Sequence, residues 1–419
     1  MTSAALVSTA EVRRALIERR EIALLDVRDE ASFAEAHPLF AASLPLDRLA
    51  AEVFERIPRR TTRVVVYDAG EQLALDAVKQ LHALGYTNVA TLDGGLDGWR
   101  RSGGEIFRDV NVPSKAFGEL VEATHHTPSL PAEELKALID AHADVVVLDA
   151  RRFDEYQTMS IPGGISVPGG ELVYRVGELA PRPDTLVVVN CAGRTRSIIG
   201  AQSLINAGIP NRVAALRNGT IGWKLAGLTL ERGQSRRFVP VSAERVKRAR
   251  ELARAVATRA DVGRANRSML SAWLADDNRT LYRFDVRTPE EFAAGHLAGF
   301  RSAPGGQLVQ ETDVFAPVRG ARIVLVDNDG VRANMTASWL AQMAWEVYVL
   351  DDGLNGEPLV IEAGHAERMS AAAAPWAKAY KRPYEGTDNP ASAMQAYLDW
   401  EYGLVAQLER DGTHGFRVV

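Results

Sequence analysis

The sequence predicts an α/β protein built from three tandem modules, each a parallel sheet with helices on both faces. An apolar run followed by Asp-x-Arg occurs three times, with its aspartate at positions 26, 149 and 285. Forty-two residues after each aspartate, another apolar run ends at Asp68, Cys191 and Asp327. Short apolar runs alternate with runs of helical periodicity, which is typical of parallel strands joined by helices. Such register indicates a true internal repeat.

Length and composition agree with this division. The chain has 419 residues and a mass of 45.6 kDa, which suits about three domains. It is 46% hydrophobic and 25% charged, as globular proteins are. A net charge of -5 and a pI near 6.0 favour neither nucleic acid nor an anionic membrane as a partner. The sequence carries no signal for an oligomeric state.

A single cysteine excludes an internal disulfide framework and a cysteine-based zinc site. The first residues lead into a mixture of acidic and basic side chains rather than the apolar core of a signal peptide. No uncharged apolar run approaches the length that spans a membrane. We therefore expect a cytoplasmic protein in a reducing environment.

The first module is expected over residues 1–112. Its second apolar run ends in Asp68-Ala-Gly-Glu-Gln, which holds an acid and no arginine, so we expect no chemistry there. A glycine-rich segment closes the module at Trp99, and a matching one closes the second module at Trp223. Both tryptophans are interpreted as packing residues of a final helix.

Residues 112–128 join the first two modules and are interpreted as a solvated, extended linker. On an extended chain the adjacent His125 and His126 would point to opposite sides, which disfavours a metal site. The linker could instead lie across the mouth of an active site, and so could the C-terminal tail.

The second module, residues 125–235, contains the stretch that singles out a function. An apolar strand, Leu186–Asn190, delivers Cys191 into a short loop that opens a helix over 198–207. The candidate catalytic residue is Cys191. The candidate substrate-binding residues are those of the loop that follows it: Ala192, Gly193, Arg194, Thr195, Arg196 and Ser197.

Three features of this loop favour a thiolate at Cys191. Thr195 or Ser197 can cap the helix, and free backbone N–H groups at a helix start bind anions. Arg194 and Arg196 add two permanent positive charges. We therefore expect the pKa of Cys191 to fall below the free value of about 8.5. The alternative is a small buried apolar cysteine, which two guanidinium groups within five residues disfavour.

The second linker, residues 236–259, holds eight Lys or Arg against two Glu. Val246, Ala249, Ala253 and Val256 recur at helical spacing, so we expect an amphipathic helix with a basic outer face that packs between modules. Binding of nucleic acid by this face is disfavoured, because no aromatic residues interleave with the charges.

The third module is expected over residues 260–357, with Asp327-Asn-Asp-Gly330 at the place of the cysteine loop. The string is similar to the start of a calcium loop, but the next residues supply no further acidic ligand at the required spacing. This module is also expected to be inert. The tail, residues 358–419, is predicted to be helical after Asn389-Pro390 and to dock on another module or on a second chain.

These motifs resemble those of the rhodanese sulfurtransferases. The resemblance rests on the Asp-x-Arg strand, on a cysteine loop with Arg196 and Ser197 at its fifth and sixth positions, and on the closing Gly-x-x-Gly-Trp. It implies three rhodanese-like modules, of which only the middle one is catalytic. It also implies transfer of a sulfane sulfur from a small donor to a thiol, cyanide or a protein acceptor, through a persulfide at Cys191 and without a metal or organic cofactor.

The loop departs from the family pattern in one place, because Gly193 stands second after the cysteine where the family commonly has glycine third. It also lacks the pattern of the mercaptopyruvate-using branch, so thiosulfate or a small persulfide is the expected donor. In the second module Ser160 stands where the family often has a histidine, which the third module keeps as His296. Arg194 and Arg196 are the candidates for orienting the sulfonate of thiosulfate.

Two alternatives remain open. Cysteine-dependent phosphatases and arsenate reductases also place a loop between a strand and a helix, but their arginine is sixth after the cysteine, whereas Arg196 is fifth. A non-enzymatic role is the second alternative, in which the modules form a scaffold and Cys191 records redox or persulfide status. Because two of the three modules lack a nucleophile, we expect the chain to act in part as a scaffold.

Overall fold

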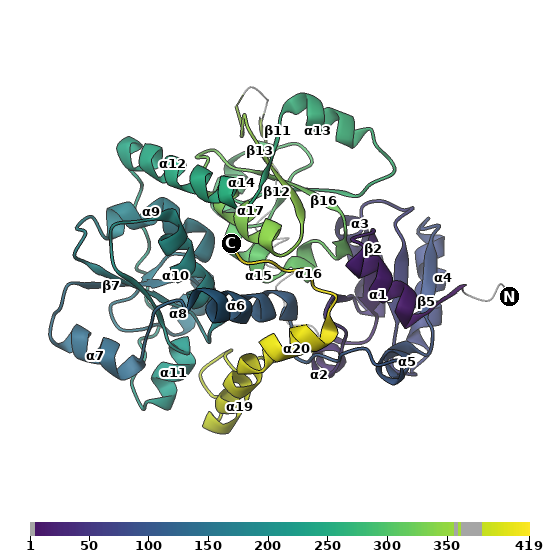
Figure 1. Cartoon of the computed structure of the whole chain (residues 1–419), viewed down its shortest axis with the longest axis horizontal. Coiled ribbons are helices and arrows are strands. Elements are labelled where there is room, and N and C mark those ends of the chain that lie inside the picture. The colour runs from purple at the N-terminus through teal and green to yellow at the C-terminus, as the bar shows by residue number, and fades with distance from the viewer. Residues whose placement is uncertain (1–4, 356–358, 362–378) are drawn as a thin grey trace.

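The computed structural model describes residues 5–355, 359–361 and 379–419. Figure 1 shows three α/β units grouped around a central helix, with the C-terminal helices below it. Of the predicted tail, residues 358 and 362–378 lie outside the described part. Within the described ranges, no helix is long and apolar enough to cross a membrane.

The first module contains a parallel sheet flanked by helices. Its strands are β1 (Ala5–Val7), β2 (Ile22–Asp26), β3 (Ala41–Ser43), β4 (Val64–Tyr67) and β5 (Val89–Leu92). Its helices are α1 (Thr9–Ile17), α2 (Glu30–Glu35), α3 (Leu46–Arg56), α4 (Leu73–Ala83) and α5 (Gly95–Arg101). The strand order is β1-β5-β4-β2-β3.

The second module repeats this order as β6-β10-β9-β7-β8, again with parallel neighbours. Its strands are β6 (Ser129–Leu130), β7 (Val145–Asp149), β8 (Ile165–Ser166), β9 (Leu186–Asn190) and β10 (Val213–Leu216). Its helices are α7 (Ala132–Asp140), α8 (Phe153–Thr158), the 3-10 turn η1 (Gly169–Glu171), α9 (Leu172–Leu179), α10 (Thr195–Ala207) and α11 (Gly219–Leu225).

The third module has the order β11-β17-β16-β12-β14. Its parallel strands are β11 (Gly263–Ala265), β12 (Leu281–Asp285), β14 (Arg301–Ser302), β16 (Arg322–Val326) and β17 (Glu346–Leu350). Its helices are α13 (Arg267–Leu274), α14 (Pro289–Ala294), α15 (Gly305–Gln310), α16 (Thr312–Phe315) and α17 (Arg332–Gln342). A small antiparallel pair joins β13 (His296–Leu297) to β18 (Leu359–Val360). The predicted fold class is confirmed.

The repeated Asp-x-Arg motif is a buried ion pair at the end of a central strand. Arg151 Nη2 donates to Asp149 Oδ2 at 2.7 Å and to the carbonyl of Met159 at 2.6 Å. The same pairing recurs in the other two modules: Arg28 with Asp26 and Arg287 with Asp285. The motif therefore fixes the strand end in every module, with or without a cysteine.

The two closing tryptophans are also structural. Trp99 and Trp223 are buried, and each indole N–H donates to a backbone carbonyl, that of Glu105 or Thr229, at 2.9 Å. The interpretation of both as packing residues is confirmed.

The segment predicted as an extended linker is instead a helix, α6 (Val112–His125). Phe117 and Val121 on α6 are fully buried, and the ring of Phe117 packs edge-on against Trp339 of α17. Figure 1 shows α6 crossing the middle of the molecule, and it packs against α10, α15 and α16. The extended-linker prediction was wrong because contacts with other modules, rather than local sequence, stabilise this helix.

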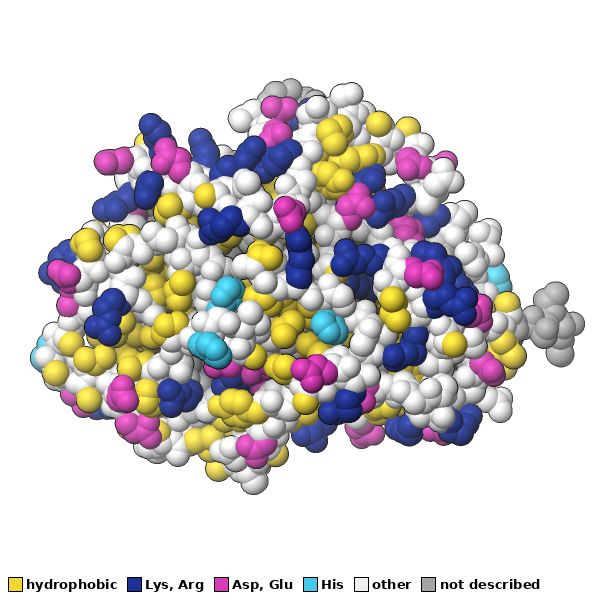
Figure 2. Space-filling view, in the orientation of Figure 1, with side chains coloured by type: hydrophobic (Ala, Val, Ile, Leu, Met, Phe, Trp, Pro, Cys, Tyr) yellow, Lys and Arg dark blue, Asp and Glu magenta, His cyan; other side chains and the backbone are white. Residues whose placement is uncertain are grey.

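The second linker forms the predicted amphipathic helix, α12 (Ala243–Arg259), which packs against α9, α10 and α17. Ala249, Ala253 and Val256 are buried, whereas Lys247 and Arg248 are exposed. Figure 2 shows the basic side chains gathered over α12 on the outer surface. The prediction that this helix packs between modules is confirmed.

Backbone contacts tie the modules to one another. A two-residue strand of the third module, β15 (Val318–Arg319), pairs antiparallel with β2 of the first. Between the second and third modules, Gly170 lies so close to Gly306 that a Cβ on Gly170 would come within 2.9 Å of the Gly306 nitrogen. The tail adds α19 (Ala391–Tyr402) and α20 (Leu404–Asp411), which pack on α6.

Candidate active site

The cysteine loop connects β9 to α10 at the carboxyl edge of the second sheet, where ligands bind in open α/β sheets. Cys191 is only 1% exposed. Its thiol donates to Ser197 Oγ at 3.4 Å, and that hydroxyl donates to the carbonyl of Arg194 at 2.8 Å. The sulfur therefore sits inside the loop, next to the first turn of α10.

The start of α11 holds the loop from the other side. The amides of Thr220 and Ile221 donate to the carbonyls of Cys191 and Ala192 at 2.9 and 3.0 Å. Gly219 has a φ of +53°, and a Cβ there would lie 2.3 Å from the Cys191 carbonyl oxygen, so only glycine fits.

The same close approach occurs in the other modules. A Cβ on Gly95 or on Gly353 would lie 2.6 Å from the carbonyl oxygen of Asp68 or Asp327, respectively. The closing glycines therefore shape the loop in all three modules rather than serve catalysis.

Arg194 does not point a free charge at the sulfur. Its Nε and Nη2 donate to the two carboxylate oxygens of Glu119 on α6, each at 2.7 Å. The guanidinium carbon also lies 4.0 Å from the ring centre of Tyr402 on α19. Arg194 is 7% exposed, so its charge is buried and compensated.

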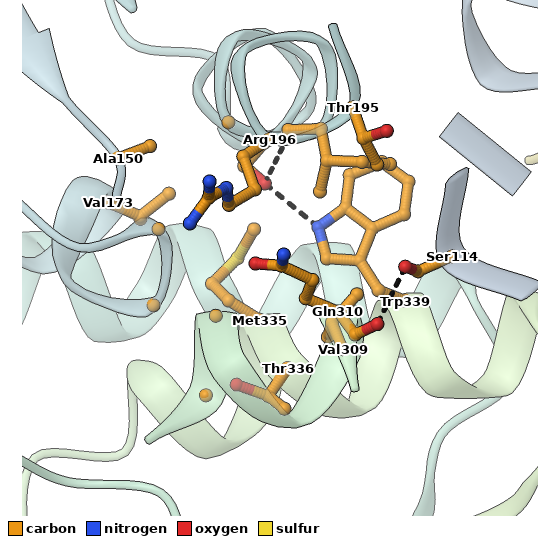
Figure 3. Close-up of a pocket in the computed structure, with 17 residues that line it drawn as sticks. Ser114, Ala150, Val173, Thr195, Arg196, Val309, Gln310, Met335, Thr336 and Trp339 are labelled. Carbon is orange, nitrogen blue, oxygen red and sulfur yellow. Dashed lines mark hydrogen bonds between the residues drawn. The ribbon is translucent and has the colours of Figure 1, made fainter. Parts of the chain in front are cut away.

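Arg196 is bound in the same way. It donates to both oxygens of Glu155 at 2.7 and 2.8 Å. Burial raises the pKa of Glu155, but the charge and hydrogen bonds of Arg196 outweigh burial and hold this pKa at about 2. Figure 3 shows Arg196 on the wall of a small cavity between the second and third modules, where Met335 and Trp339 also lie.

The third module contains the same ion pair without a cysteine. Arg332, at the position equivalent to Arg196, binds Glu291, at the position equivalent to Glu155, with Nη2 to Oε1 at 3.0 Å. The pair of Arg196 with Glu155 therefore belongs to the fold of these modules.

The expected lowering of the Cys191 pKa was wrong. Burial raises the pKa of this thiol above its ordinary value, and the charge of Arg196 and the hydrogen bonds of Ser197 lower it by less. The sequence counted two cations near the sulfur but did not reveal the carboxylates that neutralise them.

The expected helix caps were also wrong. The first residue before α10 is Arg194, and no side chain caps the helix there. The Ser197 hydroxyl donates to a carbonyl, and the Thr195 hydroxyl donates to Glu401 at 3.5 Å. No side chain therefore caps the backbone N–H groups of the first turn of α10, which face the interior of the loop.

The C-terminal helix α19 covers the loop. Tyr397 and Glu401 lie against Gly193, where an added Cβ would be 3.1 and 3.2 Å from Tyr397 Cε1 and Glu401 Oε2. Side chains of the tail form an apolar cluster with Ala192 and Ile221. The tail is therefore the segment that covers the loop, while α6 contributes Glu119 from its side.

Sequence reasoning missed Glu119 and Glu401. Glu119 belongs to the segment interpreted as a solvated linker, so no burial was expected for it. Glu401 follows Met394 by seven residues and Leu398 by three, which places it on the apolar face of its helix. An acid on that face was the signal that could have identified it.

Two carboxylates occupy the position of Cys191 in the other modules. Asp68 accepts from the amides of Gly70 and Ala74 at 3.0 and 2.9 Å. In the third module, the two carboxylate oxygens of Asp327 accept in the same way from the amides of Gly330 and Ala333, at 2.9 and 2.8 Å. In the part of the chain that the structure describes, no group of three or more His, Cys, Asp or Glu side chains could hold a metal ion.

The family model of the rhodanese-like domain matches this chain three times, over residues 8–102, 131–226 and 267–356. These ranges lie inside the three modules proposed from the repeat, whose outer limits stay a prediction. The chain belongs to the rhodanese-like domain family. It carries three such domains and a single cysteine.

Individual proteins are similar to part or all of the chain. The crystal structure of a thiosulfate sulfurtransferase from Pseudomonas aeruginosa is 52% identical and has a TM-score of 0.93, with 99% of this chain and 100% of that chain covered. The thiosulfate sulfurtransferase GlpE of Tolumonas auensis is 33% identical over 86 residues, which are 20% of this chain and 79% of GlpE. The putative sulfur carrier protein YrkF of Bacillus subtilis is 24% identical over 165 residues, 36% of this chain and 84% of YrkF.

Proposed function

We propose that the protein is a sulfurtransferase that takes a sulfane sulfur from thiosulfate or a small persulfide onto Cys191 and passes it to a thiol, cyanide or a protein acceptor. The observation that carries this proposal is the equivalence of Cys191 with Asp68 and Asp327, whose carboxylates accept hydrogen bonds from loop amides.

The geometry of a carboxylate supports this reading. An aspartate oxygen lies two bonds beyond Cβ, as does the outer sulfur of a cysteine persulfide, and both can accept a hydrogen bond from a loop amide. Burial and the charge of Asp329 raise the pKa of Asp327 to about 8, so the likeness is one of geometry rather than of charge. The amides that hold the second carboxylate oxygen belong to Ala74 and Ala333, six positions after the aspartates. The equivalent amide in the second module is that of Ser197. We therefore expect the outer sulfur to accept a hydrogen bond from the Ser197 N–H.

The reaction is a double displacement. The Cys191 thiolate attacks the outer sulfur of thiosulfate, the S–S bond breaks, and sulfite leaves with the electron pair. An acceptor nucleophile then attacks the outer sulfur of the Cys191 persulfide and regenerates the thiolate. Because burial raises the pKa of Cys191, the thiol must first lose its proton.

The roles of the loop residues follow from their contacts. The amides of Ala192, Gly193 and Arg194 and the first turn of α10 would face the bound sulfur. The guanidinium groups of Arg194 and Arg196 are already bound to Glu119 and Glu155, so they would hold the loop in shape rather than clamp a sulfonate. Thiosulfate as donor is supported by the two similar thiosulfate sulfurtransferases. A reducing compartment such as the cytoplasm would keep Cys191 available as a thiol.

The test is mass spectrometry of the intact protein after incubation with thiosulfate, followed by addition of cyanide. We expect a gain of one sulfur atom on Cys191, release of sulfite, and loss of the sulfur to cyanide as thiocyanate. Cys191→Ser is the matched control and should gain nothing. Absence of any gain with thiosulfate or glutathione persulfide would favour a sensor or scaffold, and aryl phosphate hydrolysis lost in Cys191→Ser would favour a phosphatase.

A further inference from the structure

Helix α19 places a buried carboxyl group on the cysteine loop. Glu401 is 1% exposed, although it lies in the tail and outside all three repeated modules. Its Oε1 accepts from the hydroxyl of Tyr397 at 2.7 Å and from that of Thr195, in the first turn of α10, at 3.5 Å. The acid is thus held between the tail and the start of the helix that follows Cys191.

The second carboxylate oxygen of Glu401 has no hydrogen-bond partner among the described residues. This oxygen lies 3.2 Å from the position of a Cβ on Gly193, so it faces the cysteine loop. A buried oxygen without a partner is unusual and needs an explanation. Burial raises the pKa of the Cys191 thiol and the charge of Glu401 raises it further, so this carboxyl group lies close enough to act on a charged reagent at that sulfur.

The cations around Glu401 are each bound to another carboxylate. Arg194 is bound to Glu119, Arg196 is bound to Glu155, and Lys115 of α6 is bound to Asp109 at 2.7 Å. The titratable groups that also face this region from the loop, the tail and α19 itself are Cys191, Tyr384, Tyr397 and Tyr402. Each nearby cation thus has its own carboxylate, and Glu401 is the additional acid.

We propose that Glu401 determines donor specificity by charge: its ionised carboxylate disfavours doubly charged sulfane-sulfur donors such as thiosulfate and favours donors of the same type that carry one charge or none. This inference deepens the proposed function and rests on it for the identity of the reaction. The electrostatic effect of Glu401 is independent of the proposed function, because any charged reagent that reaches Cys191 can measure it.

The effect depends on pH in a defined direction. Burial raises the pKa of Glu401 to about 7, and the charge of Glu119 adds to this, while Lys115 and Arg194 oppose it. Below this pH the group is a neutral acid and admits anions. Above it the carboxylate repels a second negative charge in a site from which water is largely excluded.

The first test uses two alkylating reagents of similar size, anionic iodoacetate and neutral iodoacetamide, on the full-length protein. Both need the Cys191 thiolate, so the ratio of their rate constants cancels its ionisation. At pH 8 we expect Glu401→Gln to raise the ratio of iodoacetate to iodoacetamide at least about fivefold, the order expected for one removed charge nearby. At pH 6 the two proteins should converge.

Asp399→Asn is the matched control, because Asp399 lies on the same helix but is exposed. It should leave the ratio unchanged. If Glu401→Gln only loosened the tail, both rate constants would rise together and the ratio would stay constant, which would overturn the proposal. An equal change in Asp399→Asn would overturn it too.

A second variant guards against misfolding of the first. Tyr397→Phe removes a hydrogen bond that lowers the pKa of Glu401. The ratio of the iodoacetate to the iodoacetamide rate constant should therefore change at a higher pH than in the unsubstituted protein. An unchanged or lower midpoint would contradict the assignment of the effect to Glu401.

The final test compares donors. The ratio of kcat/KM for thiosulfate to that for methanethiosulfonate, a singly charged donor of the same sulfur, should fall above pH 7 and should do so less in Glu401→Gln. Equal pH dependence in both proteins would contradict the proposal. If neither donor loads Cys191, the proposed function fails, and the alkylation result still decides whether Glu401 repels anions.

Discussion

At the scale of single residues, three side chains share one position in three copies of a loop. Asp68 and Asp327 fill it with a carboxylate that accepts two amide hydrogen bonds each, and Cys191 fills it with a thiol that is shorter by one atom. The two cysteine-free modules therefore hold, in their own side chains, a hydrogen-bond acceptor at the place that the outer sulfur on Cys191 would occupy only after sulfur transfer.

This equivalence predicts the behaviour of Cys191→Asp. The substitution places a carboxyl group in a loop whose two copies already hold one. The protein should therefore fold, with a melting temperature within a few degrees of that of the unsubstituted chain. Sulfur loading should be abolished. Thermal unfolding and mass spectrometry after thiosulfate treatment measure the two effects, with Cys191→Ser as the control. A large loss of thermal stability would mean that the second module lacks the amide arrangement of the other two.

The sequence was sufficient to find Cys191 and its loop, because an apolar strand, a unique cysteine and a helix start are local features. It was insufficient for the electrostatics. Glu119, Glu155 and Glu401 reach the loop from α6, α8 and α19, and only the tertiary fold brings them together. The pKa of Cys191 is raised first by burial and then by the charge of Glu401, neither of which the sequence revealed, so the direction of its shift was predicted wrongly.

At the scale of elements, the two segments outside the repeat complete the site. Helix α6 supplies the carboxylate that binds Arg194, and α19 supplies the cover. The helical character of α12 could be predicted because its apolar positions recur over about three turns. By contrast, α6 has a proline, a glycine and a run of buried polar groups. Close contact explains the glycine, since a Cβ on Gly118 would lie 2.9 Å from Thr195 Cγ2.

The buried acid of α19 predicts a pH-dependent cost of folding. The pKa of Glu401 is about 7 in the folded protein and near 4.5 when the chain is unfolded, so the folded state binds the extra proton. The stability that this group contributes is complete below pH 4.5 and is lost as the pH rises through 7. Relative to the unsubstituted protein, Glu401→Gln should therefore gain up to about 3 kcal/mol of unfolding free energy between pH 5 and pH 8.

Denaturant unfolding at several pH values measures this difference. Asp399→Asn, on the exposed face of the same helix, should give a difference that does not change with pH. If Glu401→Gln and the unsubstituted protein followed parallel curves, the acid would be ionised in both states and the cost of its burial would be absent.

At the scale of the whole molecule, the repeat predicted three parallel sheets flanked by helices, because each module is specified by its own apolar pattern. Beyond the packing of α12 between modules, the sequence did not predict the contacts that join them. Two of these contacts are a two-residue strand, Val318–Arg319, that pairs with the first module, and a backbone contact between Gly170 and Gly306. Neither has a pattern long enough to be recognised in a sequence.

The glycine contact predicts a measurable asymmetry between neighbouring substitutions. Gly170→Ala would bring a Cβ within 2.9 Å of the Gly306 nitrogen, whereas at Gly169 the nearest atom is 3.7 Å away. We expect Gly170→Ala to destabilise the protein by about 1–3 kcal/mol through overpacking, and Gly169→Ala to have a much smaller effect. Calorimetric unfolding compares the two, and equal effects would show that the modules separate easily at this contact.

The most direct test of the central claim is a crystal structure of the protein after thiosulfate treatment. The account predicts a second sulfur on Cys191, with the outer atom within hydrogen-bonding distance of the Ser197 amide. This matches the amides of Ala74 and Ala333, which lie 2.9 and 2.8 Å from their carboxylate oxygens. An outer sulfur turned away from that amide, or a treated crystal in which Cys191 is unmodified, would contradict it.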